Sequence, residues 1–139
     1  MELEDCYEKA LIKKTKENKN LAQSLIEMAD IKEETVRDSK IDERNISAYV
    51  SLAYDALRET LEALCVLKGY KVLSHLCLGE MLKNWFSDFD YEEFDRLRYA
   101  RNSINCYGVK IDFEQGKKLI EKIFRMRKTI IKKYLDVVN

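Results

Sequence analysis

Proline is absent from this chain of 139 residues, which contains only four glycines, and this shortage of helix breakers limits its possible folds. Proline removes a backbone donor and fixes φ, while glycine favours turns, so both interrupt long helices. We therefore expect long helices and few loops, which excludes β-sandwiches, collagen-like repeats and glycine-rich linkers. Because 46% of the residues are apolar, there is enough to bury in one core, and the length suits a single domain over residues 1–139.

Apolar residues recur at the spacing of an α-helix in six segments of the chain. The predicted helices cover residues 3–14, 20–37, 46–67, 75–86, 91–106 and 113–137. Residues typical of helix caps stand at several of these boundaries: Asn45 or Ser47, Ser74, Ser87 or Asp90, and Asp112 at the starts, and Gly69 and Gly108 at the ends. Since the connections are short, the sequence predicts an all-α, largely antiparallel bundle of about five to six helices.

The predicted helix over residues 46–67 is apolar around more than half of its circumference. This is typical of a helix at the centre of a bundle or at a dimer seam. The helix over residues 20–37 is amphipathic instead, and its apolar stripe is expected to face the core. The stripe consists of Leu21, Leu25, Met28 and Ala29.

The longest apolar run covers only residues 63–67, whereas about 20 residues are needed to span a bilayer. The acidic N-terminus lacks the layout of a signal peptide, so we expect a soluble, cytoplasmic protein that does not bind membranes. Its cysteines are expected to be reduced, with core packing as the main role of three of them; the four are Cys6, Cys65, Cys77 and Cys106. With His75 as the only histidine and no Cys-x-x-Cys, we predict no metal site and no cofactor.

The formal net charge is zero, but the charges are unevenly distributed along the chain. Residues 1–95 carry 13 basic and 21 acidic side chains, a balance of −8, and residues 96–139 carry 12 basic and 4 acidic ones, a balance of +8. Either acidic helices pack against basic ones, or the C-terminal third attracts an anionic partner. Without an overall positive field, we expect modest, selective binding rather than tight non-specific attachment to nucleic acid.

The predicted helix over residues 91–106 places polar side chains on its own apolar face. Phe94 and Leu97 define that face, and Arg101 falls between them at about 100° per residue. Around Arg101 lie three further polar residues, namely Arg98, Asn102 and Asn105. An arginine on an apolar face needs partners for its donors. It either bonds to helix-end carbonyls or a core carboxylate, or projects into a groove and holds an anion such as phosphate.

The run LRYARNSINCYG, over residues 97–108, resembles the signature helix of the HEPN superfamily. Those proteins are small all-α bundles with a motif of Arg, a polar residue that is often Asn, a few more residues and then His. The segment AYDALRETLEALCVLKGYKVLSHLCLGEML resembles the central helix of the family and the start of its next helix. The resemblance covers about residues 20–137.

This resemblance implies several properties. Many HEPN proteins are metal-independent endoribonucleases, several are toxins, and others bind RNA or nucleotides without cutting. They usually form homodimers in which the motif helices line one cleft, and some are paired with a minimal nucleotidyltransferase that acts as antitoxin. Arg101 and Asn102 match the catalytic Arg and the polar residue after it, and the expected ligand-binding residues are Arg98, Arg101, Asn105 and Tyr107.

The motif histidine is missing, because no histidine follows Arg101. Its place falls at Cys106 or at the neighbouring Asn105 or Tyr107. Metal-free RNA cleavage needs a base and an acid that titrate near neutrality, whereas asparagine does not titrate and unperturbed Tyr and Cys have pKa values of about 10 and 8.5. We therefore expect a dimeric module that binds RNA or a nucleotide with little or no catalysis, and it would pair with a nucleotidyltransferase.

Two alternatives stay open. The chain would be an active metal-independent endoribonuclease toxin in which Arg101 works with an unusual base, Tyr107 or Cys106. It would otherwise be a structural protein-interaction module in which Arg101 only ties the dimer together.

Other side chains have both a structural and a functional interpretation. Asp55 or Glu59 would orient Arg101, or they would pair with Arg58 on the surface of their own helix. His75 would contribute only if the helix that it begins placed it in the same cleft. The last helix carries a basic strip that is either a solvated face or a phosphate contact, and it consists of Arg125, Arg127, Lys128, Lys132 and Lys133.

Overall fold

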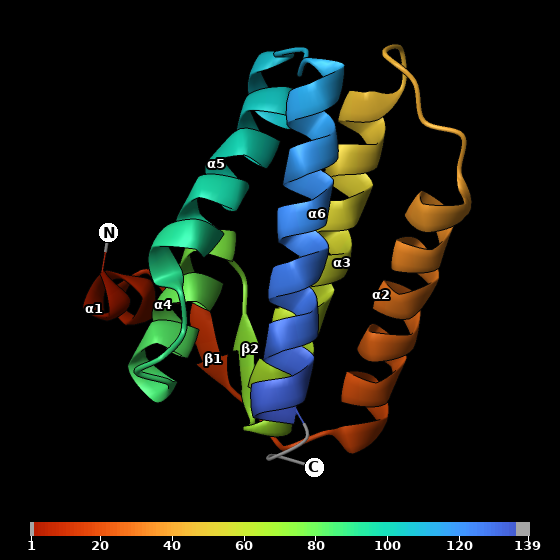
Figure 1. Cartoon of the computed structure of the whole chain (residues 1–139). Coiled ribbons are helices and arrows are strands. Elements are labelled where there is room, and N and C mark those ends of the chain that lie inside the picture. The colour runs from red at the N-terminus through yellow and green to blue at the C-terminus, as the bar shows by residue number, and fades with distance from the viewer. Residues whose placement is uncertain (1, 136–139) are drawn as a thin grey trace.

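The computed structural model describes residues 2–135, apart from the side chains of residues 106 and 107. It is an all-α helical bundle with one two-stranded antiparallel sheet, so the predicted fold class is confirmed (Figure 1). The elements are α1 (Leu3–Glu8), β1 (Ile12–Lys14), α2 (Lys19–Asp38), α3 (Ile46–Leu67), β2 (Tyr70–Val72), α4 (His75–Trp85), α5 (Tyr91–Tyr107), α6 (Phe113–Ile130) and a π-helical end, η1 (Ile131–Leu135).

Helix α3 is the central element, as its apolar sequence predicted. It packs against α2, α4, α5 and α6, and Figure 1 shows α2 and α6 on either side of it. Its fully buried side chains include Tyr54, Leu57, Leu61 and Leu64. The pairs α2–α3 and α5–α6 are antiparallel, while α3 and α6 run in the same direction (Figure 1). The arrangement brings α5, which carries Arg101, against α3.

Most helix boundaries follow local capping chemistry. The side chains of Ser74, Asp90 and Asp112 accept hydrogen bonds from backbone N–H groups in the first turns of α4, α5 and α6. Gly108 ends α5 in the left-handed conformation, with φ of 64°, which glycine adopts without steric cost. At the start of α3, Asn45 occupies the cap position but makes no capping bond with its side chain.

Helix α2 faces the core with a different stripe from the one that the sequence predicted. Ala22, Ala29 and Val36 are buried, whereas Leu21 and Met28 are about half exposed. Small side chains let α2 approach α3 closely, and polar side chains of α2 are drawn inward by charged partners on α3 and α6. The expectation for Leu21 and Met28 is therefore wrong, because the face of α2 that is turned toward the core carries its small apolar side chains and is flanked by side chains that pair with α3 and α6.

The predicted first helix over residues 3–14 is also wrong beyond Glu8. Ala10 takes a positive φ of 55°, which ends the helix, and residues 12–14 pair with residues 70–72. The pairing places Ile12 opposite Val72, and both are buried. β-Branched side chains favour such pairs on a half-buried surface. The paired residues lie 56 to 60 positions apart along the chain, so helical periodicity gave no sign of the pairing.

Cys6 and Cys77 form a disulfide with their Cα atoms 5.9 Å apart, so the expectation that all four cysteines are reduced is wrong for this pair. The β1–β2 pairing carries α1 against α4, which brings the two cysteines together despite a separation of 71 residues. Cys65 is a free thiol in the core, as predicted. The side chain of Cys106 lies outside the described residues.

The last helix was predicted to reach residue 137. Its α-helical part ends at Ile130 and η1 continues to Leu135, while residues 136 and 137 lie outside the described part of the chain. Within residues 2–135, no helix combines the length and the apolar character needed to cross a bilayer.

Candidate functional site

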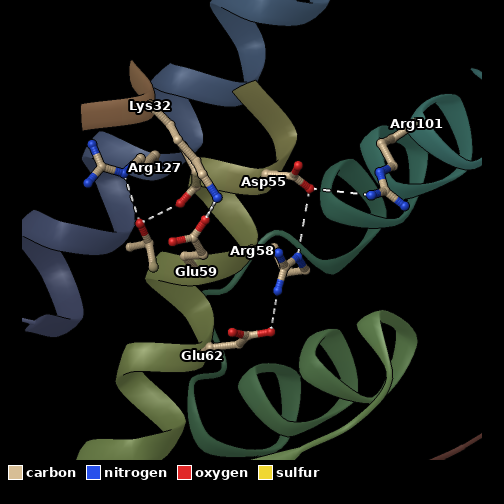
Figure 2. A network of polar contacts seen from close by, with 9 residues as sticks. Lys32, Asp55, Arg58, Glu59, Glu62, Arg101 and Arg127 are labelled. Carbon is tan, nitrogen blue, oxygen red and sulfur yellow. Dashed lines mark hydrogen bonds and ion pairs between the residues drawn. The ribbon is translucent and has the colours of Figure 1, made fainter. Parts of the chain in front are cut away.

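Arg101 lies between α5 and α3 with 20% of its side chain exposed. Its Nη2 is 3.4 Å from Oδ1 of Asp55 on α3 (Figure 2), and its guanidinium carbon lies 5.7 Å from the centre of the Tyr54 ring. Its Nε is buried and has no hydrogen-bond partner among the described residues. A guanidinium group carries five N–H donors, so this single long contact leaves most of its donor capacity unused.

Asp55 is shared between two arginines. Besides the contact with Arg101, its Oδ1 is 3.8 Å from Nε of Arg58, and Nη1 of Arg58 donates to Glu62 at 2.6 Å (Figure 2). Asp55 is therefore common to both arginines, while Glu62 is a second carboxylate partner of Arg58. Of the two carboxylates predicted to reach Arg101, Asp55 does, whereas Glu59 turns to the other side of α3 and pairs with Lys32.

His75 belongs to the same group of side chains. It is the first residue of α4, and its ring centre is 5.6 Å from that of Tyr54. Burial lowers the pKa of His75 to about 4, with the nearby positive charges of Arg58, Arg101 and Arg98 acting in the same direction and Asp55 opposing them. The imidazole is therefore neutral at pH 7, and it accepts or donates hydrogen bonds without carrying a charge.

Tyr54 forms the floor beneath these side chains. It is fully buried, and its hydroxyl has no hydrogen-bond partner among residues 2–135. Burial raises its pKa well above the usual value, although the charges of Arg98, Arg101 and Arg58 oppose this, so the hydroxyl stays protonated. Buried tyrosine hydroxyls normally have a partner. From the sequence, Tyr54 was expected only to be part of the core. Its polar hydroxyl, in the middle of the apolar face of α3, was the sign that could have pointed to the site.

The other predicted site residues on α5 are placed as follows. Arg98 donates to Asp95 on its own helix at 2.8 Å, and its charge acts on both Tyr54 and His75. Asn105 accepts a hydrogen bond from Ser51 of α3 at 2.6 Å. Asn102 is partly buried on the same helix, and the side chain of Tyr107 lies outside the described residues.

The basic strip predicted on the last helix does not exist as one surface. Arg127 is buried and donates to Thr60 at 2.8 Å, to Glu33 at 3.1 Å and to Asp30 at 2.5 Å. Its inclusion in the strip was wrong, because α2 supplies two carboxylates that make burial favourable. Lys133 pairs with Asp88, and Lys132 is exposed. Arg125 and Lys128 line a groove between α6 and α2, whereas Arg101 faces α3.

No family model matches this chain, and neither a curated protein nor a solved structure gives a significant match. The functional argument therefore depends on the residues that the fold brings together. We call this group the arginine cluster, and it consists of Tyr54, Asp55, Arg58, His75, Arg98 and Arg101. It combines three guanidinium groups, a neutral imidazole and a protonated phenol, which is a donor-rich set suited to an anion with several oxygen atoms.

Proposed function

We propose that this chain is a HEPN-like module that binds RNA or a nucleotide through the arginine cluster. The observation that carries the proposal is the state of Arg101, whose buried Nε is unpartnered and whose one side-chain hydrogen bond within residues 2–135 is 3.4 Å long. Phosphate oxygens would supply the missing acceptors in a bidentate geometry, which gives short charge-assisted hydrogen bonds. Asp55 supports this by holding the guanidinium group in position from the α3 side.

Arg58 and Arg98 extend the cluster along the backbone of the ligand. Arg98 is paired with Asp95 and Arg58 with Glu62, and the buried Nε of Arg58, like that of Arg101, has no hydrogen-bond partner among the described residues. The charges of Arg58 and Arg98 reach the buried rings between them. The expected affinity is modest because each cation has a carboxylate nearby, and it should fall as salt rises.

The cluster favours binding over catalysis. A general base works best when its pKa lies near the operating pH, whereas the pKa of His75 is held at about 4. The Tyr54 hydroxyl keeps its proton, so it does not act as a base. The same proposal includes a homodimer and a nucleotidyltransferase as partner, which rest on the family resemblance around residues 97–108.

The test is a titration of the purified protein with a fluorescein-labelled 12-nucleotide single-stranded RNA and, in parallel, with labelled ATP, followed by fluorescence anisotropy. Arg101→Ala is expected to weaken binding at least about tenfold, because one charge-assisted contact is worth roughly 1.5–3 kcal/mol. The matched control is Arg96→Ala on the same helix, where the side chain is 66% exposed and paired with Glu93. It should change binding less than about twofold.

Unchanged binding in Arg101→Ala would refute the site. Absence of binding in the wild type, with loss of the dimer in Arg101→Ala, would favour the structural module instead.

The second candidate is the metal-independent endoribonuclease, which the neutral imidazole of His75 beside Arg101 favours. Ligand phosphate near the cluster would raise the pKa of His75 and make it a better base. The test is incubation of the RNA in EDTA with separation of the products on a gel. Cleavage that His75→Gln and Arg101→Ala both abolish would establish this function, and intact RNA under conditions of saturated binding would exclude it.

A further inference from the structure

A pocket lies beside the arginine cluster, and most of the side chains that line it differ in chemistry from those of the cluster. It has a volume of about 660 Å³ and is lined by the segment before α2, the first turns of α2, the C-terminal half of α3 and strand β2. Arg58 and His75 stand at its boundary with the cluster, while Arg101 does not line it. Its volume falls within the range of about 300–1,000 Å³ that is usual for small-molecule sites.

The inner surface of this pocket is apolar. Leu25, Val66 and Val72 line its interior, and Leu21 and Leu73 stand at the rim with 46% and 50% of their surfaces exposed. Two leucines half exposed around one cavity leave apolar area in contact with water. A ligand with an apolar body would remove that area from water, which stabilises the complex in proportion to the area covered.

The charged residues of the pocket are predominantly basic. Lys16, Arg58 and Lys71 face one acidic residue, Glu62, and Glu62 already accepts a hydrogen bond from Arg58 at 2.6 Å. Neither lysine has a carboxylate within 4 Å among the described residues. His75 adds no charge at neutral pH. The pocket therefore has an excess of positive charge beside an apolar interior.

We propose that this pocket binds a small amphipathic organic anion, with its apolar body against Leu25 and Val72 and its anionic group between Lys16 and Lys71. The charge complementarity selects this class of ligand over a neutral apolar molecule. Because α2, α3 and β2 of one chain line a concave site, we expect a small molecule there rather than the flat surface of another protein. The site goes beyond the proposed RNA-binding function: Arg58 and His75 line both sites, but the residues that would hold this ligand lie on α2, on β2 and in the segment before α2.

The probe for this site is 8-anilinonaphthalene-1-sulfonate, and N-phenyl-1-naphthylamine serves as its neutral counterpart. The expected result is one saturable site per chain for the sulfonate, with at least about tenfold higher affinity than for the neutral amine. Decanoate should displace the probe and decanol should do so much less. In ¹H–¹⁵N spectra, the shifted amides should centre on residues 71–73.

Two variants with matched controls locate the binding. The double variant Lys16→Glu/Lys71→Glu should weaken sulfonate binding at least about tenfold and leave the neutral amine within about twofold. Its control, Lys117→Glu/Lys118→Glu, makes the same change of charge at two exposed lysines of α6, outside the pocket. Leu21→Asp should abolish binding of both probes, whereas Met28→Asp, which is equally exposed on the same helix, should not.

Equal losses in the two double variants would overturn the proposal, because a diffuse surface field would then explain the affinity. Several weak sites without saturation would also overturn it. A dimer that Leu21→Asp dissociates would show that a second copy of the chain covers the rim, and this outcome would refute the small-molecule site.

Discussion

Arg127 is the side chain whose polar contacts should contribute most clearly to the stability of this bundle. It projects from α6 into the space between α2 and α3, where it is 4% exposed. Its donors reach Thr60 on α3 and both Glu33 and Asp30 on α2. We predict that Arg127→Met, which keeps the apolar stem and removes the guanidinium group, lowers the free energy of unfolding by about 2–4 kcal/mol.

The magnitude follows from the burial of each partner. The hydroxyl of Thr60 is fully buried and keeps its own hydrogen bond to the carbonyl oxygen of Ala56. Removing Arg127 therefore leaves only its acceptor side without a partner, which costs roughly 1–2 kcal/mol, the lower part of the range for a buried polar group. Asp30 and Glu33 are 52% and 22% exposed, so water replaces much of the lost contact. We assign about 0.5–1 kcal/mol to each of these pairs, as for partly exposed ion pairs.

Urea unfolding followed by circular dichroism measures this change. With a slope of roughly 2 kcal/mol/M for a chain of this size, the midpoint should fall by about 1–2 M. The control is Arg125→Met on the exposed side of α6, which should stay within about 0.5 kcal/mol of the wild type. A loss in Arg127→Met no larger than that of the control would refute the idea that Arg127 ties α6 to α2 and α3.

Three further predictions concern pH, packing and the covalent link. The pKa of His75 is about 4 in the folded chain, against 6.5 for the unperturbed group. Between these pH values the unfolded state binds more protons than the folded state. The free energy of unfolding should therefore fall as the pH drops from about 6.5 to 4. This fall in stability should be smaller in His75→Gln. An equal fall in the variant and the wild type would contradict the assignment of the pH dependence to His75. Gly116→Ala should lower the free energy of unfolding in urea by roughly 1–3 kcal/mol, because an added Cβ would lie 2.2 Å from Cγ1 of Ile46. An unchanged urea midpoint would show instead that α6 shifts on α3 without cost. The double variant Cys6→Ser/Cys77→Ser should lower the free energy of unfolding by about 4 kcal/mol, because the disulfide closes a loop between cysteines that are 71 residues apart. Equal urea midpoints for this double variant and the wild type under oxidising conditions would count against it.

Local chemistry made most of the fold predictable. The bounds predicted for α3 are those of the structure, and Ser74, Asp90 and Asp112 cap the helices that they were expected to cap. Periodicity and caps act within a few residues, so a single sequence carries them. The β1–β2 pair was missed because strands of three residues contain little periodicity and their pairing is long-range.

Polar burial was harder to predict than apolar burial. Arg127 lies within the apolar stripe of α6, with Ile123 and Ile130 one turn to either side, but the carboxylates that make its burial favourable are on α2. These carboxylates flank the face that α2 turns toward the core, which leaves Leu21 and Met28 outward. In these places the position of a side chain depended on charges from another helix, which helical periodicity within one segment does not contain.

The candidate site was predictable in part. Arg101 was singled out because its position on an apolar face is unusual, and Asp55 was one of two carboxylates considered as its partner. The convergence of His75 and Tyr54 on Arg101 depends on how α4 and α5 are oriented against α3. That orientation is set by tertiary packing, which the sequence alone left open.

The link between Cys6 and Cys77 makes a closed covalent ring of the chain between them, and α2, α3 and the connection at residues 39–45 all lie on that ring. A protease that cuts this connection would therefore open the ring without separating the chain into two pieces. The nicked protein would migrate as two fragments only on a reducing gel. The polar network around Arg127 would continue to hold α2 against α3 and α6 after the cut.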